Sequence, residues 1–211
     1  MFALPIGLTG VCLLVCLGEY LRRVHLFHAE VTRKFIHITT ASFIASWPFF
    51  MSWKQIELIS LLMFAGILIS RYMHLLRAIH GIKRRTWGEL FFAMSIGIAA
   101  VMSQSDWVFA AAMLVMGVAD GFAALVGTLL DKTHRYKVFG HVKSYEGTIT
   151  FLIMTIIILF VTASLGHIPH TVFGLLWLSV LATILENIAV AGTDNLFVPL
   201  AIVILLLNPF G

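Results

Sequence analysis

The chain has 211 residues, of which 60% are hydrophobic and only 11% are charged, and its mean hydropathy is +1.00. This composition excludes an ordinary soluble globular domain and is typical of an integral membrane protein. The formal net charge of +4 indicates nothing more specific than an anionic partner or a lipid surface, so we expect membrane lipids and no nucleic acid as partners.

Eight apolar runs follow one another along the chain, and each is long enough, at roughly 17–25 residues, to cross a hydrocarbon core. The runs span residues 2–18, 35–53, 55–73, 86–104, 107–130, 148–166, 168–190 and 194–210. The first has no basic segment before it and no cleavage site after it, which favours a transmembrane helix over a signal peptide. The sequence therefore predicts one domain, 1–211, folded as an all-α, multi-pass bundle of about eight helices, with seven or nine as alternatives.

The basic residues predict how this bundle is oriented. All 14 lysines and arginines except Lys54 lie in the connections that follow the first, third and fifth runs. By the positive-inside rule these connections face the cytoplasm, and both termini lie on the opposite side. Four helix N-termini then face one cytoplasmic site, which suits a polyanion such as a nucleoside triphosphate. The alternative is that the cations only orient the protein and contact anionic lipid.

Four ionisable residues lead into the second run: Glu30, Arg33, Lys34 and His37. At 100° per residue they fall within an arc of about 100°, so all four project from one face of a helix. On a helix that enters a membrane, four ionisable side chains on one face indicate that they share a polar partner in an aqueous environment. The alternative is that the two cations anchor the helix at the interface and the glutamate pairs with them at i,i+4 spacing.

Local structure accounts for two other features. Cys12 and Cys16 lie on one face of the first run, too close for a helix to bridge, and we interpret them as packing residues. At the mouth of the fourth run, Trp87 suits the membrane interface and Glu89 suits a first helical turn.

An aspartate, Asp120, lies in the middle of the fifth run. A carboxylate is costly to bury in a membrane unless water, an ion or a partner charge reaches it, so this residue is the main site candidate. Small residues, among them Gly127, share its helix face. Gly117 and Gly121 form a small-residue motif for helix packing, which explains those glycines but not the carboxylate.

The connection after the fifth run carries Lys137, Lys143 and Ser144, and the serine is a plausible N-cap for the next helix. The Lys-Ser pair resembles the end of a phosphate-binding P-loop. Val142 stands where that motif requires glycine, however, and no strand is expected before it, so we reject a P-loop.

Carboxylates also mark the end of the seventh run and the start of the eighth. Glu186 opposes the helix dipole at its position, whereas Asp194 or Thr193 would simply cap the eighth helix. A divalent cation, Mg²⁺ or another, would account for several carboxylates converging among so many cations. The predicted metal ligands are Asp120, Glu146, Glu186 and Asp194.

Five ordered motifs occur between Glu30 and Pro199: Glu-x-x-Arg-Lys-x-x-His, Arg-x-Thr-Trp-Gly-Glu, Ala-Asp-Gly-x-Ala-x-x-x-Gly, Lys-Ser-x-Glu-Gly, and Glu followed by Asp-Asn-x-x-x-Pro. Together they resemble the polyprenol kinase family, which includes dolichol kinases, phytol kinases and a CTP-dependent diacylglycerol kinase. The resemblance implies transfer of the terminal phosphate of a nucleoside triphosphate, usually CTP, to the hydroxyl of a lipid alcohol. The motif residues it marks as important are Arg33, Lys34, Asp120, Gly127, Lys143, Ser144, Glu146 and Gly147.

The predicted roles follow from the chemistry of phosphoryl transfer, which needs charge neutralisation and alignment more than covalent participation. Asp120 would hold Mg²⁺ or accept the hydroxyl proton, while Arg33 and Lys34 would contact the transferring phosphate. Glu30 and His37 complete the catalytic set. The nucleotide side would comprise Gly127, Lys137, Lys143, Ser144, Glu146 and Gly147.

Several alternatives remain at this stage. The donor is CTP or ATP, because the loop before Lys143 is less rich in glycine than in many relatives. The acceptor is phytol, a longer polyprenol or diacylglycerol. A membrane cytidylyltransferase shares some likeness in the Lys-Ser-x-Glu-Gly motif, although no Lys or Arg follows Lys143 here. A lipid or solute carrier is the other alternative, although no internal repeat is evident.

Overall fold

The computed structural model describes residues 2–24, 29–73, 87–130 and 134–207, and for residues 29, 30, 129 and 130 it describes the backbone alone. Within these segments a helix forms at each of the eight predicted runs, so the predicted helix count is confirmed. The elements are α1 (Ala3–Arg23), α2 (Ala29–Ala45), η1 (Trp47–Phe49), α3 (Trp53–Tyr72), α5 (Gly88–Ser103), α6 (Asp106–Leu114), η2 (Val115–Ala119), α7 (Asp120–Leu130), β1 (Arg135–Val138), β2 (His141–Ser144), α8 (Tyr145–Leu165), α9 (Val172–Ile188) and α10 (Asp194–Leu207).

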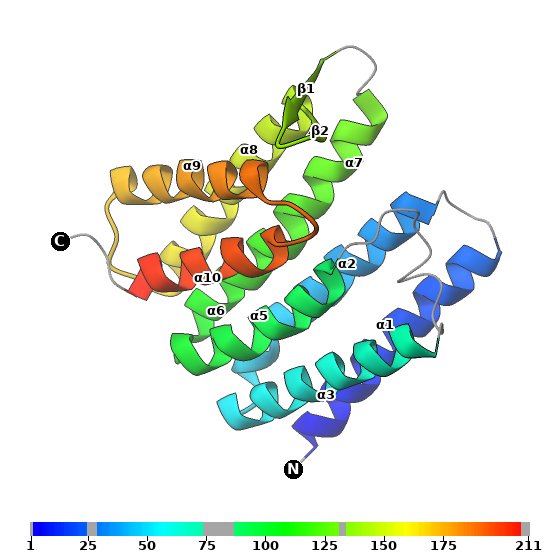
Figure 1. Cartoon of the computed structure of the whole chain (residues 1–211). Helices are drawn as coiled ribbons and strands as arrows, with labels where there is room; N and C mark the ends of the chain where they lie inside the picture. Colours follow the sequence, from blue (N-terminus) through cyan, green and yellow to red (C-terminus); the bar gives the residue numbers. More distant parts are fainter. Residues whose placement is uncertain (1, 25–28, 74–86, 131–133, 208–211) are drawn as a thin grey trace.

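The helices form two layers of four (Figure 1). One layer contains α1, α2, the continuous helix α6–η2–α7, and α8, in that order of contact; the other contains α3, α5, α10 and α9. The two layers meet where α6 packs against α5 and α10 and where α8 packs against α9. The composite helix α6–η2–α7 is the most enclosed of the long helices in the described segments. In its 18-residue apolar stretch 67% is buried, whereas in that of α1 only 17% is buried.

Small side chains explain why the centre can be so closely packed. Ala110, Ala111 and Ala112 are all buried on α6, and residues of this size let neighbouring helices approach from several sides. The largest fully buried side chains, Trp47 and Phe109 among them, fill the space beside this helix.

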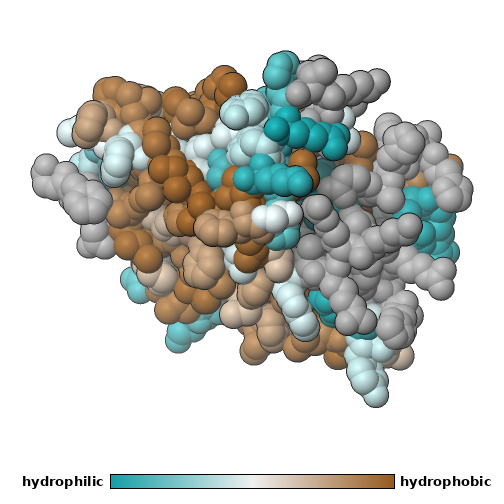
Figure 2. All heavy atoms as spheres, turned by 45° about the horizontal axis from the view of Figure 1, so that its top comes forward, coloured by the Kyte–Doolittle hydropathy of each residue, from teal (hydrophilic) through white to brown (hydrophobic). Residues whose placement is uncertain are grey.

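Within the described segments, four helices are long and apolar enough to cross a membrane: α1, α3, the span Asp106–Thr128 and α8. Three further apolar helices, α5, α9 and α10, are shorter. Exposed apolar side chains run along α8 at every fourth position, at Ile149, Ile153, Ile157, Val161 and Leu165. In water this stripe would be unfavourable, whereas a lipid environment would solvate it. Apolar side chains also cover the left side of the face shown in Figure 2, while hydrophilic ones gather in its upper part.

One element departs from the all-α prediction. Strands β1 and β2 pair as an antiparallel hairpin, with Lys137 opposite Val142 and Val138 opposite His141. Its two turn residues, Phe139 and Gly140, have φ angles of 46° and 81°. Positive φ at both positions is the backbone of the tight turns that join two strands directly. Basic residues alternate with Tyr136, Val138 and Val142 on either side of Phe139-Gly140, and this alternation could have predicted the hairpin. We interpreted the segment only as a basic loop.

Candidate active site

Two glycines set the position of the candidate site by bringing α2 against the composite helix. A Cβ added at Gly117 would lie 2.0 Å from the Cβ of Ala41, and one at Gly121 would lie 2.2 Å from Cγ1 of Ile38. Any larger side chain would push the helices apart, so the predicted small-residue packing motif is confirmed. The close approach places the charged start of α2 beside the first turn of α7.

At this crossing Lys34 and Asp120 form an ion pair. The Lys34 Nζ donates a hydrogen bond to Asp120 Oδ2 at 2.6 Å, and the two side chains are only 8% and 14% exposed. A charge-assisted bond in so enclosed a place is stronger than one in water. The partner charge that the buried carboxylate required is therefore a lysine from a helix distant in sequence.

His37 extends this pair by one turn of α2. Its Nε2 lies 3.5 Å from Asp120 Oδ2 and 3.1 Å from the carbonyl oxygen of Met116. Because a carbonyl can only accept, Nε2 carries the hydrogen and donates it. The imidazole ring also packs against Phe92 of α5, with the ring centres 5.0 Å apart.

The helix geometry just before Asp120 is unusual. Residues Val115–Ala119 form a π-helical turn, in which the Asp120 N–H donates to the carbonyl oxygens of Val115 and Gly117. The Met116 carbonyl instead accepts from His37. Single π-helical turns inside α-helices occur often at functional sites, because they free main-chain groups and reorient side chains.

The other predicted residues at the start of α2 are placed less completely. Arg33 acts electrostatically on Asp120 and on Glu89, so it belongs to the same charged region. Glu30 lies in the first turn of α2, but its side chain is outside the described part of the chain. The basic segment around Arg84 and Arg85 is also outside it.

A second lysine pairs with a second carboxylate near the first pair. Lys143 of β2 bonds to the Glu186 carboxylate and, at 2.7 Å, to the main-chain oxygen of the same residue. The lysine therefore satisfies a carbonyl in the last turn of α9 and compensates a carboxylate that opposes the helix dipole. Glu146 pairs instead with His134, whose Nδ1 lies 2.7 Å from Glu146 Oε1.

The predicted metal ligands are thus only partly brought together. Asp120, Glu186 and Asp194 act on one another electrostatically. No three His, Cys, Asp or Glu side chains within the described segments are close enough to hold a metal by themselves. Mg²⁺, however, commonly uses one or two carboxylates together with water and substrate phosphates. Asp194 fits such a role because its Oδ1 is buried and has no hydrogen-bond partner among the described residues.

The glycines on the predicted nucleotide side have a packing explanation. A Cβ at Gly127 would lie 2.7 Å from Ser144 Oγ, and one at Gly147 would lie 3.0 Å from the Ala123 carbonyl. Both residues therefore allow α7 and α8 to approach closely. Ser144 Oγ accepts from the Gly147 N–H at 3.1 Å, which confirms the predicted N-cap of α8.

Residues that the sequence did not single out hold the hairpin in place. The Tyr136 hydroxyl bonds to Thr148 of α8 and to Asn187 of α9. Strand alternation puts Tyr136 on the same face as its cross-strand partner Lys143, and puts Lys137 on the opposite face. The two predicted phosphate-binding lysines therefore point to different sides of the hairpin, and the side chain of Lys137 is exposed.

The starts of α5 and α10 are joined to each other. Asn195 Nδ2 donates to the Gly88 carbonyl at 3.0 Å, and the Trp87 N–H donates to the Ala191 carbonyl at 3.0 Å. Gly192, at a φ of 92°, lies so close that an added Cβ would be 2.5 Å from the Gly88 Cα. These contacts hold two helix N-termini together at the same end of the bundle.

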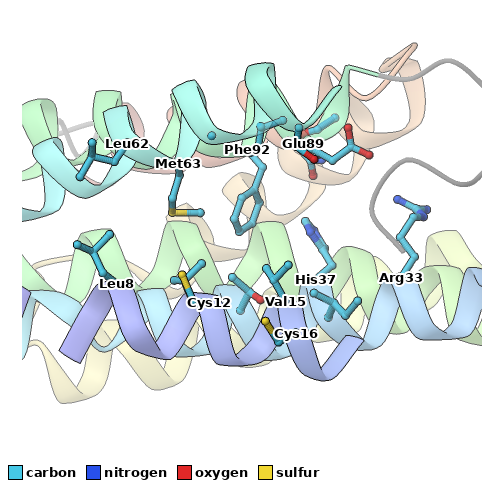
Figure 3. A pocket seen from close by; sticks show the side chains of 18 residues that line it. Leu8, Cys12, Val15, Cys16, Arg33, His37, Leu62, Met63, Glu89 and Phe92 are labelled. Carbon is cyan, nitrogen blue, oxygen red and sulfur yellow. Dashed lines mark hydrogen bonds between the residues drawn. The ribbon is translucent and has the colours of Figure 1, made fainter. Parts of the chain in front are cut away.

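A cavity of about 420 Å³ lies between α1, α2, α3 and α5 (Figure 3). Its walls are mainly apolar, with Leu8, Val11, Val15, Leu62, Met63 and Ile67 among the lining residues. Its other end is polar and is lined by Arg33, His37, Glu89 and Asn195. Figure 3 shows the change along its length, from Leu8 and Leu62 at one end to Arg33 and Glu89 at the other. We call this cavity the groove.

His37 connects the groove to the ion pair, because it lines the groove and lies 3.5 Å from Asp120. An apolar molecule with one polar end therefore fits the groove with that end beside the Lys34–Asp120 pair. The sequence did not predict the participation of α1 and α3.

Comparison with known proteins gives one informative relative. The chain is 36% identical to a phytol kinase from Synechocystis sp., in an alignment that covers 93% of this chain and 88% of that protein. No protein-family profile and no solved structure matches the chain.

Proposed function

The chain belongs to the polyprenol and phytol kinase family, and we propose that it transfers the terminal phosphate of a nucleoside triphosphate to the hydroxyl of a lipid alcohol. The observation that carries this proposal is the groove, which is apolar along its walls and ends at His37 beside the Lys34–Asp120 pair. A hydrocarbon tail fits the walls, and a hydroxyl fits the polar end.

The residues at the polar end suit in-line phosphoryl transfer. The hydroxyl oxygen attacks the terminal phosphorus, the bond from that phosphorus to the bridging oxygen breaks, and the nucleoside diphosphate leaves. Arg33 and Lys34 stabilise the charge on the transferring phosphate. Asp120 has one of two roles: it accepts the hydroxyl proton, or it holds a cation together with Asp194.

Mg²⁺ is the proposed cofactor, and its chemistry would be to neutralise charge on the phosphates. Asp120 and Asp194 would hold it, because the two carboxylates are close enough to interact electrostatically. In addition, Oδ1 of Asp194 is buried and has no hydrogen-bond partner within the described segments. His37 lies 3.5 Å from Oδ2 of Asp120, the same carboxylate oxygen that accepts from Lys34. The remaining phosphates would lie toward the starts of α8 and α10, near Lys143, because helix N-termini attract anions.

We propose CTP as the donor, on the resemblance of the motifs, with ATP as the alternative. The test is a purified-protein assay with nucleotide labelled on the terminal phosphate and a panel of phytol, a longer polyprenol and diacylglycerol. A kinase transfers the label to lipid. Release of pyrophosphate would instead indicate a cytidylyltransferase. Absence of nucleotide consumption with every alcohol would contradict both enzymes and leave a carrier.

The proposed setting is a multi-pass membrane protein whose active site faces the cytoplasm. Four sufficiently long apolar helices and the exposed apolar stripe on α8 support membrane insertion. The test places single cysteines by Arg84→Cys, Arg135→Cys and His167→Cys in a chain whose native cysteines are replaced. The first two should react with an impermeant maleimide only from the cytoplasmic face, and the third only from the other face. Labelling of all three from one face would contradict this orientation.

A further inference from the structure

Gly66 is a glycine in the interior of α3 that no packing contact explains. Glycine in a helix interior costs about 1 kcal/mol relative to alanine, so its presence needs a reason. At Gly7 and Gly18 of α1 the reason is visible, because an added Cβ would lie 2.3 Å from Met51 Cε and 1.9 Å from Ile36 Cδ1. A Cβ added at Gly66 would meet no atom within 4 Å.

The position of Gly66 supplies the reason. Leu62, Met63, Gly66, Ile67 and Ser70 line the groove from one face of α3. This face extends over nine residues, from Leu62 to Ser70, or about 12 Å at 1.5 Å per residue. Gly66 lies in its middle and is exposed, and a Cβ added there would enter open space beside the groove.

We propose that Gly66 is a specificity-determining residue, whose missing side chain admits the hydrocarbon tail of a single-chain lipid alcohol between α1 and α3. The inference rests on the proposed function, because it takes the hydroxyl to lie at the His37 end. It adds which helices hold the tail and which residue selects it.

The size of the groove favours one tail. A cavity of about 420 Å³ holds about 14 groups the size of a water molecule, at about 30 Å³ each, and a methylene group has a similar size. Space for about 14 methylene groups suffices for most of one hydrocarbon chain of about 15 to 20 carbons. The end of a longer tail would pass Leu62, which is 46% exposed, toward the surrounding lipid.

The first experiment compares Gly66→Ala and Gly66→Leu with a matched control, Ala65→Leu. Ala65 is the preceding residue of α3, is exposed, and does not line the groove. Phosphorylation is measured with phytol, which has a long tail, and with geraniol, which has a short one. A few methylene groups in a hydrophobic site change transition-state binding by about 10-fold or more.

Gly66→Leu should therefore lower the kcat/KM ratio of phytol to geraniol about 10-fold, mainly through KM, and Gly66→Ala should lower it less. Ala65→Leu should leave the ratio within about twofold of the natural protein, as expected for a surface substitution. An unchanged ratio in Gly66→Leu would overturn the inference while leaving the kinase proposal intact.

The second experiment does not depend on activity. Cys12 and Cys16 line the groove and are the only cysteines of the chain. Both are exposed, and no other thiol of the chain contributes to the signal, so their alkylation by N-ethylmaleimide, followed by intact mass, reports on access to the α1 wall of the groove. Phytol should slow alkylation of the natural protein and of Ala65→Leu, and it should protect Gly66→Leu much less.

The two readouts separate the inference from the function on which it rests. If no alcohol is phosphorylated but phytol protects the thiols in a Gly66-dependent way, the groove assignment stands and the kinase proposal fails. If phytol protects neither the natural protein nor the control, the groove assignment is wrong. Thermal unfolding checks that each variant is folded, and Gly66→Ala decides the question should the leucine variant unfold.

Discussion

Two lysine–carboxylate pairs lie at the same end of the bundle, and they differ in what else each lysine contacts. Lys34 reaches Asp120 from a neighbouring long helix, and the pair stands beside His37 and the groove. Lys143 reaches Glu186 from a hairpin, and it also satisfies the main-chain oxygen of that residue. Both lysines act electrostatically on Asp194, so the pairs share one charged region.

We propose that the first pair acts in catalysis and that the second pair acts mainly in structure. The second pair completes the C-terminal end of α9, which would otherwise leave a carbonyl and a carboxylate uncompensated. The first pair completes no helix end, because Asp120 lies within a continuous helix. No helix end therefore accounts for the cost of placing this pair where it is largely buried, which is why we propose a catalytic role for it.

The largest effect should come from Asp120→Asn, which keeps the side-chain shape and removes its charge. Loss of a metal ligand or general base should lower lipid phosphorylation by about 10²-fold or more. The matched control is Glu186→Gln, which removes the carboxylate of the other pair and should cost much less activity. Specific activity and thermal midpoint are measured on the same detergent-purified sample. Near-normal specific activity of Asp120→Asn would assign its carboxylate to structure alone.

The next effect should come from Lys34→Ala. A lost charge-assisted hydrogen bond costs on the order of 1.5–3 kcal/mol, which corresponds to about 10- to 150-fold in rate if the bond acts on the transferring phosphate. Steady-state kinetics with nucleotide and alcohol varied separately measure this. If kcat and KM for the nucleotide are unchanged, Lys34 does not contact the phosphate, and it serves instead to anchor α2 at the membrane interface.

Lys143→Ala should reduce turnover by a smaller factor and should mainly lower stability. Among the described residues, the substitution leaves the Glu186 carboxylate without the lysine that pairs with it and leaves its carbonyl unsatisfied, at a cost of about 1–3 kcal/mol. The comparison is of thermal midpoints, with Lys137→Ala as the control from the exposed face of the hairpin. A loss of activity equal to that of Lys34→Ala, at unchanged stability, would remove the distinction between the two pairs.

The smallest effect should come from Tyr136→Phe, which removes the hydroxyl that ties the hairpin to Thr148 and Asn187. The expected loss is about 1 kcal/mol of unfolding free energy, with turnover within about twofold. Tyr145→Phe is the control, since its ring packs against Tyr136 and its side chain is largely exposed. A large loss of turnover in Tyr136→Phe alone would give the hairpin a catalytic role.

The sequence predicted the helices well because an apolar run of membrane length has few alternatives. It missed the hairpin, because its two strands have only four residues each and because every second residue in them is basic, which is also typical of a loop. The sidedness of the membrane and the position of the termini stay predictions, since they depend on charge distribution rather than on contacts within the chain.

The sequence predicted those site residues whose burial in an apolar run is costly. It did not predict those whose position depends on contacts between elements that are distant in the sequence. Asp120 stood out because a carboxylate in an apolar run needs a partner, and Lys34 and His37 shared a face that could supply one. The pairing of Lys143 with Glu186 depends on how the hairpin folds over α9. The groove depends on α1 and α3 lying across from each other, which no local pattern encodes. Cys12 and Cys16 were interpreted as packing residues, whereas they line the groove.

The π-helical turn at Val115–Ala119 fixes the rotational phase between the two halves of the central helix. One extra residue in a turn rotates everything after it by about 100° relative to an uninterrupted α-helix. Before the turn, Phe109 and Met113 face the packed interior; after it, Asp120 faces Lys34. Deleting one residue from this turn should therefore turn the Asp120 carboxylate away from Lys34 and His37.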